Sequence, residues 1–160
     1  MAALRVLAIA VASGRVGYSF LIGDRLRDWG TSDKAAKSPT KAAETAQKWI
    51  NEFNPDVVVT EKLDPECRKG KKSKRIIAAI ASTAEHNYVL DVAVPREHSY
   101  QSKYEEAEAL ANQYPDLRDW APKKRRFFDN EPRNTVIFEA LSLALTVLRG
   151  PSAQLAAAMG

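Results

Sequence analysis

The sequence has one cysteine and two histidines among its 160 residues, and no apolar run long enough to span a bilayer. The lone Cys67 excludes an internal disulfide and favours a reducing compartment, so a cytoplasmic location is expected and the thiol is interpreted as incidental. His86 and His98 have no cysteine or histidine at metal-ligand spacing, which argues against a zinc site. A membrane partner is not predicted.

Positive charge is only slightly in excess, with 24 Lys and Arg residues against 20 Asp and Glu, but two clusters concentrate it. They cover residues 68–75 and 123–126. Such clusters are most often solvated surface. Two in a short chain favour a polyanionic partner, because neutralising phosphates drives affinity for nucleic acid. The residues predicted to make these contacts are Lys69, Lys71, Lys72, Lys74, Arg75, Lys123, Lys124, Arg125 and Arg126.

Each cluster has a plainer alternative. The first precedes a predicted helix, where exposed cations are common, yet positive charge at a helix amino terminus opposes the helix dipole and so favours an anionic partner. Beside the second cluster, Phe127 is predicted to stack on a base or to wedge between bases. Alternatively, Phe127 or Phe128 packs into the core and anchors its loop.

The order of apolar patterns predicts an α/β fold. Strand-like runs over residues 4–11, 16–22 and 25–29 are joined by tight turns at Ser13-Gly14 and Gly23-Asp24, which indicates a three-strand antiparallel meander. Ser38 and Pro39 are typical of a helix start, and Asn54-Pro55 ends that helix. The remaining predicted elements are a strand over 56–60, a helix from the first basic cluster to Asn87, a strand over 88–94, and helices over 103–113 and 133–149.

This order predicts a five-stranded mixed sheet, a meander plus two further strands, with helices on both faces. An apolar content of 45% and a charged content of 28% are ordinary for a globular protein. We expect one domain over residues 1–150 and a peripheral tail over residues 151–160.

An acid interrupts the last predicted helix. From Val136 to Leu148 the chain reads VIFEALSLALTVL, where Glu139, Ser142 and Thr146 are the only polar residues. A helix so apolar is expected inside the fold, and a buried carboxylate there must be paired or hold a metal. The alternative is that Glu139 points along the one wet edge of a half-buried helix.

Three segments, in this order, resemble RuvC-type Holliday junction resolvases, which have an RNase H-like fold. Residues 6–18, VLAIAVASGRVGY, resemble the family's first strand, small turn, Arg and Gly-Tyr pair. Residues 56–61, DVVVTE, resemble its strand ending in a catalytic Glu, and residues 139–145, EALSLAL, resemble its C-terminal helix motif.

The resemblance implies a structure-specific DNA endonuclease that acts on branched or junction DNA as a homodimer. It implies two-metal phosphodiester hydrolysis with Mg²⁺, or with Mn²⁺ in its place. Glu61 and Glu139 are then the catalytic carboxylates and metal ligands, and Arg15 contacts the nucleic acid.

The chain departs from the family pattern at the expected ligands. Ala10 stands at the position of the first catalytic Asp, Val136 stands where the family has an acid or His, and the helix acid is Glu rather than Asp. Ala10 therefore reflects a deliberately silenced site, a natural loss of cutting or a shifted strand register. The substitute carboxylates considered are Asp24, Asp129 and Glu131.

Three functions follow. The first is an endonuclease of the resolvase type that is inactive or impaired because of Ala10, and the second is a non-catalytic nucleic-acid-binding module on the same fold. The third is an RNA-processing nuclease, since one fold serves several functions. Small-molecule phosphotransfer is disfavoured, because Ser13-Gly14 makes a poor phosphate loop.

Overall fold

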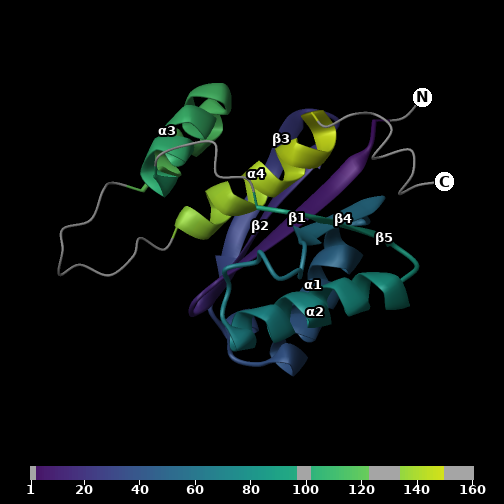
Figure 1. Ribbon diagram of the computed structural model, residues 1–160. Coiled ribbons are helices and arrows are strands. Elements are labelled where there is room, and N and C mark those ends of the chain that lie inside the picture. Colours follow the sequence, from purple (N-terminus) through teal and green to yellow (C-terminus); the bar gives the residue numbers. More distant parts are fainter. Residues whose placement is uncertain (1–2, 97–101, 123–133, 150–160) are drawn as a thin grey trace.

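Five strands form one mixed sheet in the computed structural model of the protein, in the order β3-β2-β1-β4-β5 (Figure 1). The structure describes residues 3–96, 102–122 and 134–149. The first three strands are antiparallel neighbours, whereas β4 runs parallel to β1 and β5 runs parallel to β4. The strands are β1 (Arg5–Ala12), β2 (Arg15–Ile22), β3 (Arg25–Ser32), β4 (Val57–Glu61) and β5 (Leu90–Val94). This topology confirms the predicted meander with two added strands.

Two glycines close the meander. Gly14 and Gly23 adopt φ values of +84° and +63°, in the left-handed region that suits glycine in tight turns. The third strand is longer than predicted, because it continues past Trp29 to Ser32. Residues 34–36, expected as loop, form a short 3₁₀ turn, η1 (Lys34–Ala36).

Helices cover both faces of the sheet, as predicted (Figure 1). α1 (Pro39–Phe53) and α2 (Lys71–His86) lie against one face, and α4 (Thr135–Arg149) lies against the other. α3 (Lys103–Gln113) and the 3₁₀ turn η2 (Pro115–Trp120) follow β5 in the chain, and α3 packs on α4. The predicted start of α1 is confirmed, because the Ser38 side chain accepts a hydrogen bond from Lys41 N at 3.1 Å.

The central strand β1 is buried on both faces, as its unbroken apolar run predicts. Val6, Ala8 and Ala10 belong to the core beneath α4. Leu7, Ile9 and Val11 belong to the core formed with α1 and α2. Successive side chains of β1 thus point to opposite faces of the sheet, one toward α4 and the next toward α1 and α2.

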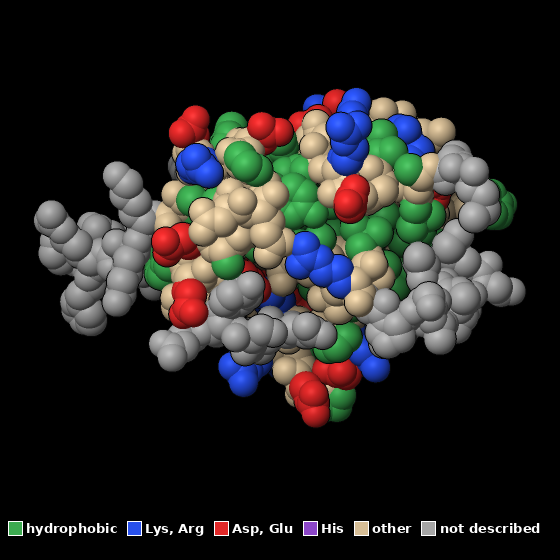
Figure 2. All heavy atoms as spheres, turned by 90° about the horizontal axis from the view of Figure 1, so that it is seen from above, with side chains coloured by type: hydrophobic (Ala, Val, Ile, Leu, Met, Phe, Trp, Pro, Cys, Tyr) green, Lys and Arg blue, Asp and Glu red, His purple; other side chains and the backbone are tan. Residues whose placement is uncertain are grey.

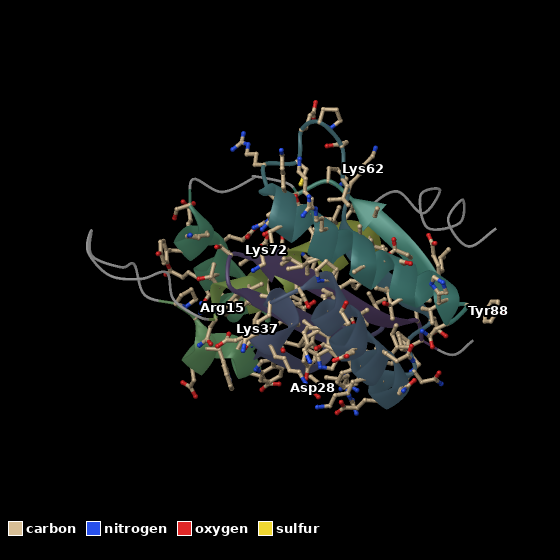
Figure 3. The ribbon with its side chains drawn as sticks, turned by 90° about the horizontal axis from the view of Figure 1, so that it is seen from below. Arg15, Asp28, Lys37, Lys62, Lys72 and Tyr88 are labelled. Atoms are coloured by element: carbon tan, nitrogen blue, oxygen red, sulfur yellow. The ribbon has the colours of Figure 1, made fainter. Side chains whose placement is uncertain are left out.

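The prediction of a strand beginning at Tyr88 is wrong, since β5 begins at Leu90. Tyr88 has a φ of +57° and is 99% exposed, and its N–H donates to Glu85 O at 3.0 Å. The chain thus turns sharply out of α2 before it can enter the sheet. Tyr88 projects from the end of the molecule opposite to Arg15 and Lys37 (Figure 3).

The face that carries α3 and α4 shows hydrophobic side chains in its middle and acidic side chains toward its α3 end (Figure 2). It is therefore not a continuous basic surface. Within the described ranges, no helix is both long and apolar enough to cross a membrane.

Asp91 lies on the edge strand β5 and accepts a hydrogen bond from Thr60 Oγ1 at 3.1 Å. Burial raises the pKa of Asp91 from its ordinary 3.8 to about 6. The Thr60 hydrogen bond opposes this rise, and the charge of Glu85 adds to it. Ionised Asp91 therefore weakens the folded state at neutral pH.

Asp91→Asn is expected to raise the free energy of unfolding at pH 7.5 by about 1–2 kcal/mol, a value reduced for partial exposure. Because the folded-state pKa of about 6 exceeds 3.8, ionisation removes stability as pH rises between these values. The gain should vanish below about pH 4, where Asp91 is protonated in both states. Urea unfolding at the two pH values measures it, and an equal gain at both would contradict the assignment.

Candidate functional site

The polar residues of α4 form one stripe on an otherwise buried helix. Glu139, Ser142 and Thr146 recur at spacings of three and four, which places them on one helix face. The other residues from Thr135 to Val147 are buried. The Glu139 side chain lies on this polar edge, as the alternative expects, but it is only 12% exposed and has cationic partners.

The carboxyl ends of the parallel strands bring a second acid to this helix. Ala8 pairs with Val59, and continuing the same register places Ala10 opposite Glu61, the last residue of β4. Ala10 belongs to the core beneath α4, and Glu61 lines the cavity that α4 borders. Ala10 is 2% exposed and Glu61 is 5% exposed. The two positions that the resemblance pairs therefore lie side by side.

A cavity of about 750 Å³ opens between the end of β4, the loop that follows it, the start of α3 and the first turns of α4. Both predicted carboxylates, Glu61 and Glu139, line it, as does Ala12 from the end of β1. Ala10 lies beneath and does not line it. The other charged residues of its wall are Lys62, Asp64, Glu66, Arg68, Lys69, Arg96, Lys103 and Glu106.

Lys69 holds Glu139 directly. Its Nζ donates to Glu139 Oε1 at 2.6 Å, and the Lys69 side chain is 22% exposed. Arg96 Nε lies 3.7 Å from the same oxygen. One carboxylate oxygen is thus shared by two side-chain cations, which meets the requirement that a buried acid be paired.

Arg96 also joins α3 to α4. Its guanidinium forms two hydrogen bonds with Glu106, of which the Nη1–Oε2 bond measures 3.1 Å, and donates to Ser142 Oγ at 3.0 Å. Ser142 Oγ in turn donates to Glu106 Oε2 at 3.1 Å. Burial alone would lower the pKa of Arg96, but the hydrogen bonds and charge of Glu106, followed by the charges of Glu139 and Glu61, raise it. Arg96 therefore stays charged.

Cys67, interpreted from the sequence as incidental, contacts the site. Its Sγ donates to Glu61 Oε2 at 3.0 Å. Burial raises the pKa of the Cys67 thiol, and the hydrogen bond to Glu61 raises it further. The thiol is thus kept protonated as a donor to the carboxylate.

Apolar groups fill the places where the resemblance expects two further ligands. Ala10 pairs with Gly17 on β2, and a Cβ at Gly17 would meet Val136 Cγ1 at 2.5 Å. Val136, which is 1% exposed, therefore packs directly on the backbone beside Ala10. A methyl and an isopropyl group supply no oxygen for Mg²⁺.

The donor set does not fit a two-metal centre. Of four expected ligand positions, two are apolar and buried, and the Glu139 carboxylate is engaged by Lys69 and Arg96. Within the described residues, no group of three or more His, Cys, Asp or Glu side chains is placed to hold a metal ion. The proposed substitute Asp24 follows Ile22, which pairs with Arg5 at the far end of β1 from Ala12. Asp129 and Glu131 lie outside the described residues.

The first basic cluster surrounds the start of α2. Lys71, Lys72 and Arg75 are exposed, whereas Lys74 is half-buried. Seen from the side of α1 and α2, Lys72, Arg15 and Lys37 lie toward the same end of the molecule (Figure 3). Arg15 Nε lies 3.5 Å from Asp33 Oδ1, so its charge is partly compensated. The second set, Lys123, Lys124, Arg125, Arg126 and Phe127, lies outside the described residues.

Sequence reasoning missed Arg96 and Glu106. Arg96 follows Pro95 directly after β5, and the carboxyl ends of neighbouring parallel strands meet at one sheet edge, so its position was available from the pattern. Glu106 carries no comparable signal, because it is one of several acids in a weakly amphipathic helix. Only the packing of α3 on α4 buries it, to 6% exposure.

No family model matches the sequence, and a search of curated proteins finds no match. Among solved structures, the chain is similar to RuvC of Thermus thermophilus, with a TM-score of 0.60 and 15% identity over 92% of this chain and 97% of that one. For T. thermophilus RuvC in complex with a Holliday junction substrate, the TM-score is 0.58 and the identity 17%, over 98% and 97% of the two chains.

The chain is also similar to the Fowlpox virus resolvase in complex with Holliday junction DNA. The TM-score is 0.60 and the identity 16%, over 91% of this chain and 99% of that one. At such identities the likeness shows a shared fold. It confirms the predicted RNase H-like fold and the resemblance to RuvC-type resolvases at that level.

Arg96→Met is expected to lower the free energy of unfolding by about 3 kcal/mol, because it leaves Glu106 buried without its counter-charge. The double variant Arg96→Met/Glu106→Met should lie within about 1 kcal/mol of wild type, since an apolar pair replaces both charges. Urea unfolding of both variants measures this. A double variant no more stable than the single one would show that Glu106 is not the principal partner.

Proposed function

We propose that this chain binds branched DNA on a RuvC-like fold and does not cut it by two-metal hydrolysis. The observation that carries this proposal is the donor set: Ala10 and Val136 are apolar neighbours at Gly17, while Glu139 is neutralised by side-chain cations. The RuvC-like fold and the basic clusters at residues 68–75 and 123–126 suit a polyanionic partner. The side chains of the site do not suit paired Mg²⁺ or Mn²⁺ ions.

The binding surface in this proposal is the start of α2. Lys71, Lys72 and Arg75 project into solvent beside a cavity whose rim carries Arg68 and Lys62. These cations contact the phosphate backbone, which fixes position without reading sequence. The junction substrates in two of the similar solved structures favour branched DNA over other polyanions.

A homodimer is the proposed active form, because a four-way junction has two-fold symmetry and a two-fold protein matches it. The second basic set at residues 123–126 is proposed to contact phosphates of the junction, and Phe127 to stack on a base or wedge between bases. We also propose a cytoplasmic location for the protein.

Replacing Lys71, Lys72 and Arg75 together by Ala should weaken binding to a four-way junction. The magnitude of the slope of log affinity against log salt should fall by about 2–3, because the variant neutralises fewer phosphates and so releases fewer counterions on binding. A control variant removes three exposed cations elsewhere, Arg25, Arg27 and Lys48, and should keep most of the slope. The same titrations, followed by light scattering, should give two chains per junction. A salt-independent wild-type affinity, or tighter binding of duplex RNA than of junction DNA, would contradict the proposal.

Ala10→Asp separates binding from latent catalysis. We expect the variant to bind a four-way junction but to release no nicked product with Mg²⁺ or Mn²⁺, since Val136 still supplies no ligand and Lys69 still holds Glu139. It should also be less stable by about 2–3 kcal/mol, because it buries an unpaired acid. The assay uses a labelled junction on a denaturing gel. Metal-dependent cleavage at symmetric positions would instead show an endonuclease silenced only at Ala10.

A further inference from the structure

The loop between β4 and α2, residues 62–70, is tied to the buried carboxylates at two points. Cys67 Sγ donates to Glu61 Oε2 at 3.0 Å, and Lys69 Nζ donates to Glu139 Oε1 at 2.6 Å. In the part of the chain that the structure describes, these are the two side-chain hydrogen bonds from this loop to the rest of the fold. Lys62 N also donates to Val94 O at 2.7 Å, so the sheet holds the start of the loop. The two acids that the resemblance assigns to metal ions hold its later part, at Cys67 and Lys69.

The basic start of α2 depends on this loop. Gly70 precedes α2 directly and provides no side-chain cap, and a Cβ at Gly70 would meet nothing within 4 Å. Gly70 contributes only its carbonyl, which accepts a hydrogen bond from Lys74 N at 3.0 Å within the helix, and the neighbouring anchor to the rest of the fold is Lys69. Because Lys71 and Lys72 follow within two residues, the direction of the loop sets where their charges lie.

We propose that Glu61 and Glu139 are positioning residues that anchor the loop 62–70, and with it the cations of α2, in place of holding metal ions. Glu139 acts through Lys69, and Glu61 acts through Cys67. The effect on DNA rests on the proposed function above, whereas the anchoring itself does not.

Removing the Glu139 carboxylate is expected to weaken DNA binding, which is the opposite of the usual effect of removing an acid. Removing an acid beside a DNA-binding surface ordinarily strengthens binding, because it removes repulsion from phosphates. If Glu139 anchors the loop, Glu139→Gln should weaken junction binding by roughly threefold or more instead. Glu66→Gln is the matched control, since Glu66 is exposed, lines the same cavity and shows no side-chain hydrogen bond or ion pair within the described structure. It should leave binding unchanged or slightly stronger.

Cys67 gives a readout that needs no DNA, because it is the one thiol of the chain. Its rate of reaction with a small aromatic disulfide reagent at pH 8 reports how often the loop opens. Glu139→Gln and Lys69→Ala should each raise the rate by roughly fivefold or more. Lys69→Arg retains the ion pair and should restore a rate near wild type, and Glu66→Gln should not change it. Thermal unfolding of each variant verifies that it is folded at the assay temperature.

An unchanged thiol rate in folded Glu139→Gln would overturn the proposal. A second result would also overturn it: millimolar Mn²⁺ raises the thiol rate of the wild-type protein to that of Glu139→Gln. That result would show that the Glu139 carboxylate exchanges Lys69 for a metal ion. If the wild-type chain binds no junction, the proposed function fails, and the thiol rates still decide whether Glu139 anchors the loop.

Discussion

The buried carboxylate of Glu139 needs a counter-charge, and the arrangement of the whole site follows from how that need is met. In a two-metal enzyme the counter-charge would be divalent ions held by several acids. Here Lys69 and Arg96 share one carboxylate oxygen, and Arg96 also binds Glu106. The charges that hold the helices and the loop together here are thus side chains of the chain itself.

The sheet makes this arrangement possible. Parallel pairing of β1, β4 and β5 brings the carboxyl ends of three strands to one edge, where Ala12, Glu61 and the residues after β5 meet. α4 crosses this edge with Glu139 at the cavity, and α3 closes the far side through Glu106. Glu61, Glu106 and Glu139 each have a donor at hydrogen-bond distance, which is the condition for burying charge without large loss of stability.

The shared fold does not by itself decide the chemistry of the site. Its architecture follows solved resolvases over more than nine-tenths of the chain at 15–17% identity, yet two expected ligand positions carry apolar side chains. Both positions lie in the packed core: Ala10 pairs with Gly17, and Val136 packs so closely on Gly17 that a Cβ there would meet it at 2.5 Å. The fold therefore does not require metal ligands at these two positions, since the core requires volume and apolarity.

Hydrophobic period and turn chemistry determined most of the architecture directly from sequence, because they act through neighbouring residues. The meander, the Ser38 cap and the single apolar helix with one acid all follow from local pattern. The strand does not begin at Tyr88 because Tyr88 and Val89 close the end of α2 through hydrogen bonds to Glu85 O and Ala84 O, in a left-handed turn that the apolar pattern does not reveal. The pairing of Lys69 with Glu139, seventy residues apart, and of Arg96 with Glu106 across two helices was decided only by tertiary structure. Several cations of the sequence could pair with Glu139 or Glu106, and only the distances in the folded chain show which of them do.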